Sequence, residues 1–306
     1  MTRSLFIFLS CILLLLPFIG MAGMVSISTQ LFVCFPFILL LGIPHGAIDN
    51  ILYRRTSSIS NTNFIVTYLG LIGANVLLWI LWPAMAYALF LIISAYHFGQ
   101  SEFSHLITHQ GVLSRTLYFF WGVTVLSSLI FLNHSEIAAV TPAYAELESI
   151  AVIHNLTLIR NILGVGIVMT TALIAVHYRA GFLSMESILM EILVVGAIMV
   201  VFYLLPLLIG FTVYFVIMHS VKVLREEYLV LKDSKMIRDV TGFIKMLLPL
   251  TIFSILGLLL LWMVVQMELI QTSYGYIVMI SVSAITFPHV FVMNRFYRTI
   301  QASTKL

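Results

Sequence analysis

Four histidines close apolar runs of this sequence, and their type and position point to metal chemistry. They are His45 in LGIPHGAIDN, His97 in SAYHFGQSEF, His219 in YFVIMHSVKV and His289 in ITFPHVFVMN. Imidazole is the commonest protein ligand for transition metals. An ionisable group inside a membrane span is a candidate functional residue. The set predicts a metal site, although a lone histidine at the end of a span more often lies among lipid headgroups.

Two carboxylates follow the first two histidines closely. Asp49 comes four residues after His45, and Glu102 comes five residues after His97. A metal-bound histidine usually donates its second ring N–H to a carboxylate, a carbonyl or water. We therefore predict that Asp49 and Glu102 support catalysis by orienting the ligands, with Asp49 accepting from His45 if the helix continues that far. The alternative is that Asp49 only ends a helix, where a negative charge is unfavourable.

The other five histidines provide a comparison. His177 also ends an apolar run, at a membrane depth similar to that of the first four, and is an alternative fourth ligand. His105 and His109 have the spacing of one helix face but lie in a short polar segment, which favours a solvated turn. His134 and His154 lie in the polar stretch 134–156 and are interpreted as surface residues.

Composition determines the class of protein that holds these residues. The chain has 306 residues, of which 61% are hydrophobic and only 9% are charged. A soluble domain carries about 25% charged residues, so this chain is predicted to be an integral membrane protein. The apolar runs are continuous rather than alternating, and backbone groups in lipid must be satisfied internally. We predict an all-α polytopic transmembrane helix bundle that forms a single integral membrane domain over residues 1–306.

Ten spans fit the apolar runs. They are 4–22, 29–47, 64–82, 84–98, 115–133, 157–177, 188–205, 207–222, 245–266 and 274–294. Two long runs are divided at Pro83 and Pro206, because each is too long for one straight span. The first segment has the charged start and apolar middle of a signal peptide, but we prefer an uncleaved anchor.

Basic residues orient these spans, because Lys and Arg concentrate in cytoplasmic loops. With the N-terminus inside, 14 of the 15 Lys and Arg residues fall on the cytoplasmic side, and only Arg160 falls outside. Ten spans with both termini in the cytoplasm, in the cell (inner) membrane, are therefore expected. The four histidines then end spans that run from outside to inside. They share one depth near the cytoplasmic boundary, where they could converge in the bundle core.

Several other kinds of chemistry find no support in the sequence. There is no Walker loop, no dinucleotide-binding glycine motif, no H-E-x-x-H zinc motif and no G-x-S-x-G nucleophile motif. No Lys or Asp lies in the middle of a span, which argues against a proton-driven transporter. Basic residues follow the membrane topology, so nucleic acid is not an expected partner. Cys11 and Cys34 lie in apolar runs and are interpreted as packing residues.

The segments GIPHGAIDN, YHFGQSE, FVIMHSVK and FPHVFVM resemble the four motifs of the Brp/Blh family of membrane β-carotene 15,15′-dioxygenases. The resemblance extends from the second predicted span to the tenth. It implies an Fe(II) enzyme that cleaves the central double bond of β-carotene with O2 to give two retinals. The iron is expected on His45, His97, His219 and His289. Glu102 departs from the aspartate of many members, and no second histidine lies four residues after His219, since Val223 is there.

The implied substrate has no polar atom, so apolar contacts must hold it. Aromatic residues that flank the histidines could line its tunnel: Tyr96, Phe98, Phe211, Tyr214, Phe215, Phe287 and Phe291. Membrane lipid is the expected surrounding of the substrate, and a rhodopsin is an expected acceptor of retinal. Two alternatives remain open, a haem-binding protein and a carotenoid- or retinal-binding protein without cleavage activity.

Overall fold

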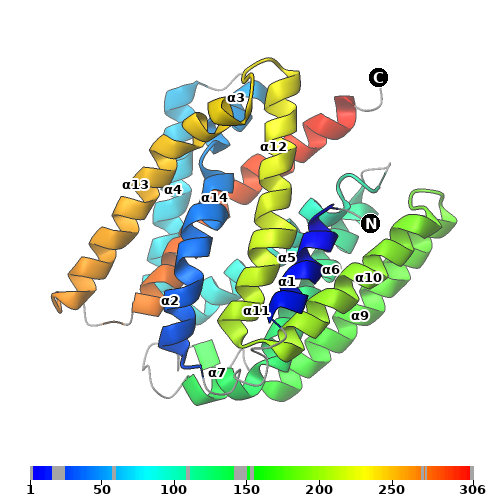
Figure 1. Cartoon of the computed structure of the whole chain (residues 1–306), viewed down its shortest axis with the longest axis horizontal. Coiled ribbons are helices and arrows are strands. Elements are labelled where there is room, and N and C mark those ends of the chain that lie inside the picture. The colour runs from blue at the N-terminus through cyan, green and yellow to red at the C-terminus, as the bar shows by residue number, and fades with distance from the viewer. Residues whose placement is uncertain are drawn as a thin grey trace. The chain divides into compact units, whose positions relative to one another are not determined.

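The computed structural model describes residues 3–15, 25–56, 60–107, 111–140, 150–151, 155–269, 272 and 274–303. Within these residues the regular elements are all helical, which confirms the all-α prediction. In chain order they are α1 (Arg3–Leu15), α2 (Ile27–Phe37), η2 (Ile38–Gly42), η3 (Ile43–Gly46), α3 (Asp49–Thr56), α4 (Asn61–Leu81), α5 (Pro83–Phe103), α6 (Val112–Leu132), α7 (His134–Val140), α9 (Leu156–Arg179), α10 (Met185–Leu204), α11 (Leu207–Val213), η6 (Tyr214–Ser220), α12 (Val221–Asp233), α13 (Val240–Gln266) and α14 (Tyr274–Ser303). Figure 1 labels the α-helices and colours the chain from blue at the N-terminus to red at the C-terminus.

Eight helical stretches of the described residues are long and apolar enough to cross a membrane. This finding confirms a multi-pass membrane protein. The other two predicted spans correspond to α1, a short apolar helix, and to α5. The 21-residue α5 is less apolar because His97, Gln100 and Glu102 lie in its last turns. The number of ten spans and the side of each terminus stay predictions.

The chain divides into two compact units, and each is assembled from separate stretches of sequence. Unit 1 comprises Met1–Cys34 and Leu91–His219, and unit 2 comprises Phe35–Phe90 and Ser220–Leu306. Each unit therefore holds two of the four candidate histidines, His97 and His219 in unit 1 and His45 and His289 in unit 2. The single domain over the whole chain stays a prediction.

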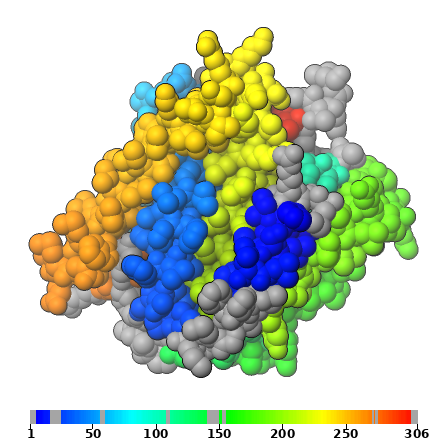
Figure 2. Space-filling model, in the orientation of Figure 1, coloured from blue at the N-terminus to red at the C-terminus, as the bar shows by residue number. Residues whose placement is uncertain are grey.

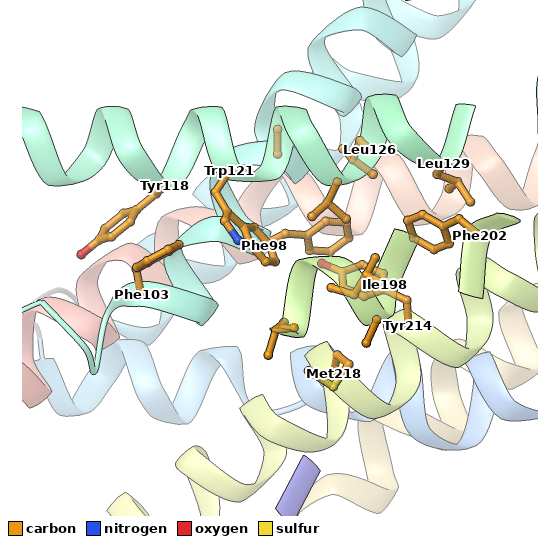
Figure 3. Packing of buried hydrophobic residues seen from close by; sticks show 14 of the residues in the cluster. Phe98, Phe103, Tyr118, Trp121, Leu126, Leu129, Ile198, Phe202, Tyr214 and Met218 are labelled. Carbon is orange, nitrogen blue, oxygen red and sulfur yellow. The ribbon is translucent and has the colours of Figure 1, made fainter. Parts of the chain in front are cut away.

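Unit 1 is built around α6, which packs against α9 and α10 (Figure 1). Its core is aromatic, and Figure 3 shows Trp121, Phe202 and Tyr214 among its members. A β-carbon added at Gly99 of α5 would lie 1.8 Å from the Tyr118 carbonyl oxygen of α6. One added at Gly122 of α6 would lie 1.8 Å from the Ala95 carbonyl oxygen. The two helices thus touch backbone to backbone, and this crossing fixes the helix that carries His97.

Polar side chains satisfy the first amides of α11, the helix that leads to His219. The Leu207 N–H donates to Glu136 Oε2 at 2.9 Å, and the Leu208 N–H donates to Gln30 Oε1 at 3.0 Å. Gln30 Nε2 in turn donates to Glu136. The first amides of a helix have no partner within it, and its N-terminus favours negative charge. Glu136 therefore anchors the start of this helix.

Unit 2 is built around α14, which packs against α4 and α3. The Trp79 indole N–H donates to Ser283 Oγ at 3.1 Å, and that hydroxyl donates to Asn75 Oδ1 at 3.1 Å. Helix α13 leaves a broad apolar face uncovered, visible in orange in Figure 2, as expected of a helix against lipid. Helix α12 buries Val223, Glu227 and Leu231 as one stripe. Glu227 is therefore fully buried, although the polar sequence around it is typical of a solvated helix.

Candidate metal centre

His45 of unit 2 lies where the helix geometry changes twice. It follows the π-helical turn η2 and belongs to the 3-10 turn η3. Pro44 is the second residue of η3 and has no N–H to donate to the preceding turn, which favours the change of helix geometry here. His45 is buried, and its Nδ1–H donates to the Gly42 carbonyl. Helical irregularities of this kind are frequent at functional sites.

His289 lies beside His45 within the same unit. The two ring centroids are 4.9 Å apart and the rings are nearly perpendicular, at 78°. His289 Nδ1 lies 2.8 Å from Asp49 Oδ1 and 3.0 Å from Oδ2. The Tyr68 hydroxyl donates to Asp49 Oδ2 at 2.9 Å. Gly46 packs against the ring, since its added β-carbon would lie 3.5 Å from His289 Nδ1. Asp49 therefore orients His289, and Tyr68 holds Asp49.

The partner of Asp49 differs from the one expected from the sequence. We expected Asp49 to accept from His45 on one continuous helix. The chain instead turns after η3, and a new helix, α3, begins at Asp49. The carboxylate thus lies at a helix N-terminus, where its charge is favourable, and it faces His289, 240 residues away. His45 donates a hydrogen bond to the Gly42 carbonyl instead of to Asp49.

His97 and His219 form the corresponding pair in unit 1. Their ring centroids are 4.8 Å apart at an interplanar angle of 81°, and both side chains are buried. His219 lies in the π-helical segment η6, and its Nδ1 is 3.0 Å from Ser101 Oγ. Phe98 meets the His219 ring edge-on at 4.8 Å, and Phe215 stacks on it at 5.6 Å. The ring of His219 is therefore held on three sides.

The donor set fits a transition metal. Three of the four histidines have Nδ1 within hydrogen-bond distance of a protein oxygen: the Gly42 carbonyl for His45, the Ser101 hydroxyl for His219 and the Asp49 carboxylate for His289. Nε2 is then the nitrogen that each ring offers to a metal. Metal-binding histidines almost always have their other nitrogen engaged in this way, which fixes the ring.

His177, the alternative fourth ligand, has both ring nitrogens engaged. It is completely buried on α9. Its Nδ1–H donates to the Leu173 carbonyl at 2.8 Å, and its Nε2 lies 3.1 Å from Ser114 Oγ. A ligand needs a nitrogen lone pair that is not shared with a neighbouring hydroxyl. The arrangement of His177 therefore favours a structural role within unit 1.

The remaining histidines lie apart from both pairs. His105 is exposed just beyond α5, in line with the solvated turn predicted there. His134 is half-buried at the first residue of α7. His109 and His154 lie outside the described residues.

The other predicted site residues differ in their surroundings. Glu102 is buried on α5 in unit 1. Phe98 and Tyr214 are buried in one aromatic cluster with ring centroids 5.6 Å apart (Figure 3), and Phe211 stacks on Phe215 at 5.3 Å.

The three other aromatic candidates, like Phe211 and Phe215, are not fully buried. Tyr96 of unit 1 is partly buried, and its hydroxyl accepts from Gln100 at 3.3 Å. Phe287 of unit 2 is partly buried. Phe291 is 57% exposed, because it lies two positions after His289 on α14, on the opposite side of the helix.

Three buried or partly buried polar residues were not singled out from the sequence. Ser101 lies one helical turn after His97, and that spacing is the local signal that could have indicated it. Tyr68 contacts Asp49 from another helix, and the sequence around Tyr68 does not indicate this contact. Glu191 lies inside the apolar helix α10 and accepts from the Trp121 indole N–H. Buried carboxylates inside a span are rare, which is itself a signal.

Comparison with known proteins places these residues in a family. A sequence model of the family described as beta-carotene 15,15'-dioxygenase matches residues 37–297. The chain belongs to this family. The matched region contains all four candidate histidines and both carboxylates, so the resemblance of the histidine motifs is confirmed.

A curated relative from uncultured marine bacterium 66A03, named beta-carotene 15,15'-dioxygenase, is 33% identical over 91 residues. That alignment covers 25% of this chain and 33% of the relative, so the chain spans about a third of the relative's length. No solved structure matches the chain.

Proposed function

We propose that this chain is an iron-dependent dioxygenase that cleaves the central double bond of β-carotene with O2 to give two retinals. The observation that carries the proposal is the pairing of four buried histidines, His45 with His289 and His97 with His219. Membership of the family supports the reaction and the substrate.

In this proposal the two pairs bind one Fe(II) ion. Four neutral imidazoles would leave the ion its full positive charge. Bound iron supplies the redox chemistry that a reaction with O2 requires. Asp49 keeps His289 in the tautomer that directs Nε2 to the metal. Glu102 is proposed as a second supporting carboxylate, on the helix of His97.

The reaction needs no other oxidant or reductant. The central carbon–carbon double bond breaks, and each of its two carbons becomes an aldehyde carbon with one oxygen atom from O2. The chain's task is to bind and align a long apolar molecule and to exclude water. Buried aromatic side chains such as Phe98 and Tyr214 suit both tasks, since they offer large apolar surfaces and few hydrogen-bonding groups. Tyr96, Phe211, Phe215 and Phe287 are proposed as further lining residues.

The membrane supplies the substrate in this proposal. β-Carotene dissolves in lipid, and a multi-pass protein can take it up without passage through water. We place the protein in the cell (inner) membrane, with the metal near the cytoplasmic side. Retinal, also apolar, would leave through lipid toward a rhodopsin.

Expression in β-carotene-producing cells tests the proposal. The expected result is loss of colour and a single twenty-carbon aldehyde, because central cleavage of a symmetric chain gives two equal halves. His97→Ala in the same cells is the matched control and should keep the colour. Unequal apocarotenals would show that another bond is cleaved.

Two further outcomes would favour the alternatives. A Soret absorption band in the purified protein would indicate haem on the histidines. Pigment that stays bound without cleavage, in the presence of iron and O2, would indicate a carotenoid-binding protein.

A further inference from the structure

Ser101 of α5 lies against one of the proposed ligands, and nothing in the family comparison assigns it a role. We propose that Ser101 is a positioning residue that holds His219 in the Nδ1–H tautomer, so that Nε2 carries the lone pair for the metal. This inference rests on the proposed function. It concerns residues of unit 1 alone.

The hydroxyl proton of Ser101 decides the direction of its hydrogen bond to His219. Ser101 Oγ donates to the Phe98 carbonyl at 2.9 Å, and a hydroxyl has only one proton to give. In the proposal this proton goes to Phe98, so Ser101 accepts from His219 Nδ1, at 3.0 Å. The ring must supply the proton, so Nδ1 is protonated. A neutral imidazole then has its lone pair on Nε2.

Burial makes this hydrogen bond decisive. Ser101 is 2% exposed and His219 is 1% exposed, so water does not replace the acceptor if the hydroxyl is removed. A buried donor that loses its acceptor pays its full desolvation cost. The ring can avoid that cost only by moving its proton to Nε2, which removes the lone pair from the metal side, or by turning.

Turning is restricted by the aromatic neighbours of His219. Phe215 lies nearly parallel to the ring, at 21°, and Phe98 meets it at 65°. These contacts fix the plane of the ring but do not distinguish its two nitrogens. Ser101 is a polar contact that does, because it lies on Nδ1. The aromatic residues and the serine thus have separate effects, one on ring orientation and one on the proton position.

One face of α5 supplies both parts of the arrangement. His97 and Ser101 are four residues apart, and residues with this spacing lie on the same side of a helix. The same helix therefore carries one proposed ligand and the acceptor that orients the other. The close crossing of α5 with α6 holds this face in place.

The chain also contains a matched control. Ser114 and His177 form a second buried serine–histidine pair in unit 1. There the ring donates Nδ1–H to a carbonyl, and Ser114 lies on Nε2. His177 is not among the proposed ligands. Ser114→Ala removes a buried hydroxyl next to a histidine that is not a proposed ligand. It is therefore the control for Ser101→Ala, which removes a buried hydroxyl next to a proposed ligand.

The first experiment reads the tautomer directly. The full-length apoprotein, labelled with ¹⁵N-histidine, is measured by NMR, and the His219 signals are identified by their loss in His219→Gln. Protonated Nδ1 and unprotonated Nε2 are expected. The opposite tautomer in the wild-type protein would overturn the proposal, and this measurement needs no serine variant that folds.

The second experiment measures metal affinity with Co²⁺ alone, by visible absorption under chelator competition. Ser101→Ala should bind Co²⁺ about 10–100-fold more weakly, the usual effect of losing a group that orients a ligand. Ser101→Thr, which keeps the hydroxyl, should restore most of the affinity, and Ser114→Ala should retain it. Equal affinity in Ser101→Ala and Ser114→Ala would refute the role of Ser101.

Retinal formation by the wild-type protein separates this inference from the proposed function. Wild-type protein that makes retinal, with unchanged Co²⁺ affinity in Ser101→Ala, would overturn only the role of Ser101. Wild-type protein that binds Co²⁺ with Ser101-dependent affinity but makes no retinal would support that role and overturn the reaction. Wild-type protein that binds neither Co²⁺ nor iron would overturn both.

Discussion

Asp49→Asn is the substitution that most sharply tests the hydrogen bonds around His289. Asp49 Oδ2 receives both the Tyr68 hydroxyl at 2.9 Å and His289 Nδ1–H at 3.0 Å, while Oδ1 receives only His289, at 2.8 Å. An asparagine can place its oxygen at the Oδ2 position and its NH2 at the Oδ1 position. Both donors then keep an acceptor. The substitution removes the negative charge and the shorter contact to His289.

The size of the effect follows from this geometry. A hydrogen bond to a charged group contributes about 1.5–3 kcal/mol, and one between neutral groups contributes about 0.5–1.5 kcal/mol. The loss at Asp49→Asn is therefore about 1–1.5 kcal/mol for each of two bonds. Each 1.4 kcal/mol is about tenfold in affinity. The two losses together are about 2–3 kcal/mol, so we expect Asp49→Asn to weaken metal binding about 30–140-fold, near the upper end of the usual ~10–100-fold effect of such partners.

Two variants bracket that expectation. Asp49→Ala leaves both buried donors without an acceptor, at roughly 1–3 kcal/mol each, and should also lower the thermal midpoint. Tyr68→Phe removes one donor but keeps the carboxylate on His289, so its metal affinity should fall less than tenfold.

The assay is Co²⁺ affinity of the apoprotein, with iron content and retinal yield measured in parallel. The reasoning is refuted if Asp49→Asn binds metal like the wild-type protein. It is also refuted if Tyr68→Phe weakens binding more than Asp49→Asn does.

Three further predictions concern ligand choice, helix packing and topology. His289→Ala should abolish retinal formation and lower bound iron, as should alanine at each of the other three proposed ligands, whereas His177→Ala should keep iron and lose stability by roughly 1–3 kcal/mol; the opposite result would make His177 the fourth ligand. Gly99→Ala would place a β-carbon 1.8 Å from a carbonyl oxygen of α6. It should lower the free energy of unfolding by at least the ~1–3 kcal/mol of ordinary overpacking and so lower the thermal midpoint. Gly164→Ala, whose added β-carbon meets nothing within 4 Å, should leave the midpoint unchanged. A cysteine at Ser149, a position outside the described residues, should react with an impermeant reagent from outside the cell; labelling only after permeabilisation would contradict the ten-span topology.

The sequence predicted the helices well, because hydropathy marks where a chain can lie in lipid. The division at Pro83 is confirmed, since α4 ends at Leu81 and α5 begins at Pro83. The division at Pro206 is confirmed in the same way, since α11 begins at Leu207. A proline lacks the N–H that would bond to the preceding turn, so it favours a break that can be read locally, although Pro249 and Pro288 lie inside continuous helices.

Helix ends and irregularities were less predictable. Helix α12 continues to Asp233, far beyond the predicted end at 222, because its polar sequence still buries one stripe of side chains. The π-helical turns η2 and η6 have no sequence signal of their own, since they result from packing and from the residues that follow. Hydropathy measures averages over a window and does not detect either effect.

The histidines were found from their positions, but their partners were not. Asp49 was predicted to orient a ligand, and it was matched with the neighbour in sequence, His45. The observed contact with His289 joins residues 240 positions apart. No periodicity within a single helix contains that information, because tertiary packing alone brings α3 and α14 together.

The interleaving of the two units has a consequence for how the protein is made. Unit 2 begins with residues 35–90 and is completed only by residues 220–306, so most of unit 1 is synthesised in between. At about 5–20 residues per second, the 240 residues that separate Asp49 from His289 correspond to roughly 10–50 s of translation. Throughout that interval the nascent chain holds His45 and Asp49 in the membrane without their partner. Any metal that needs His289 can therefore be loaded only after the last helix has left the ribosome and entered the bilayer.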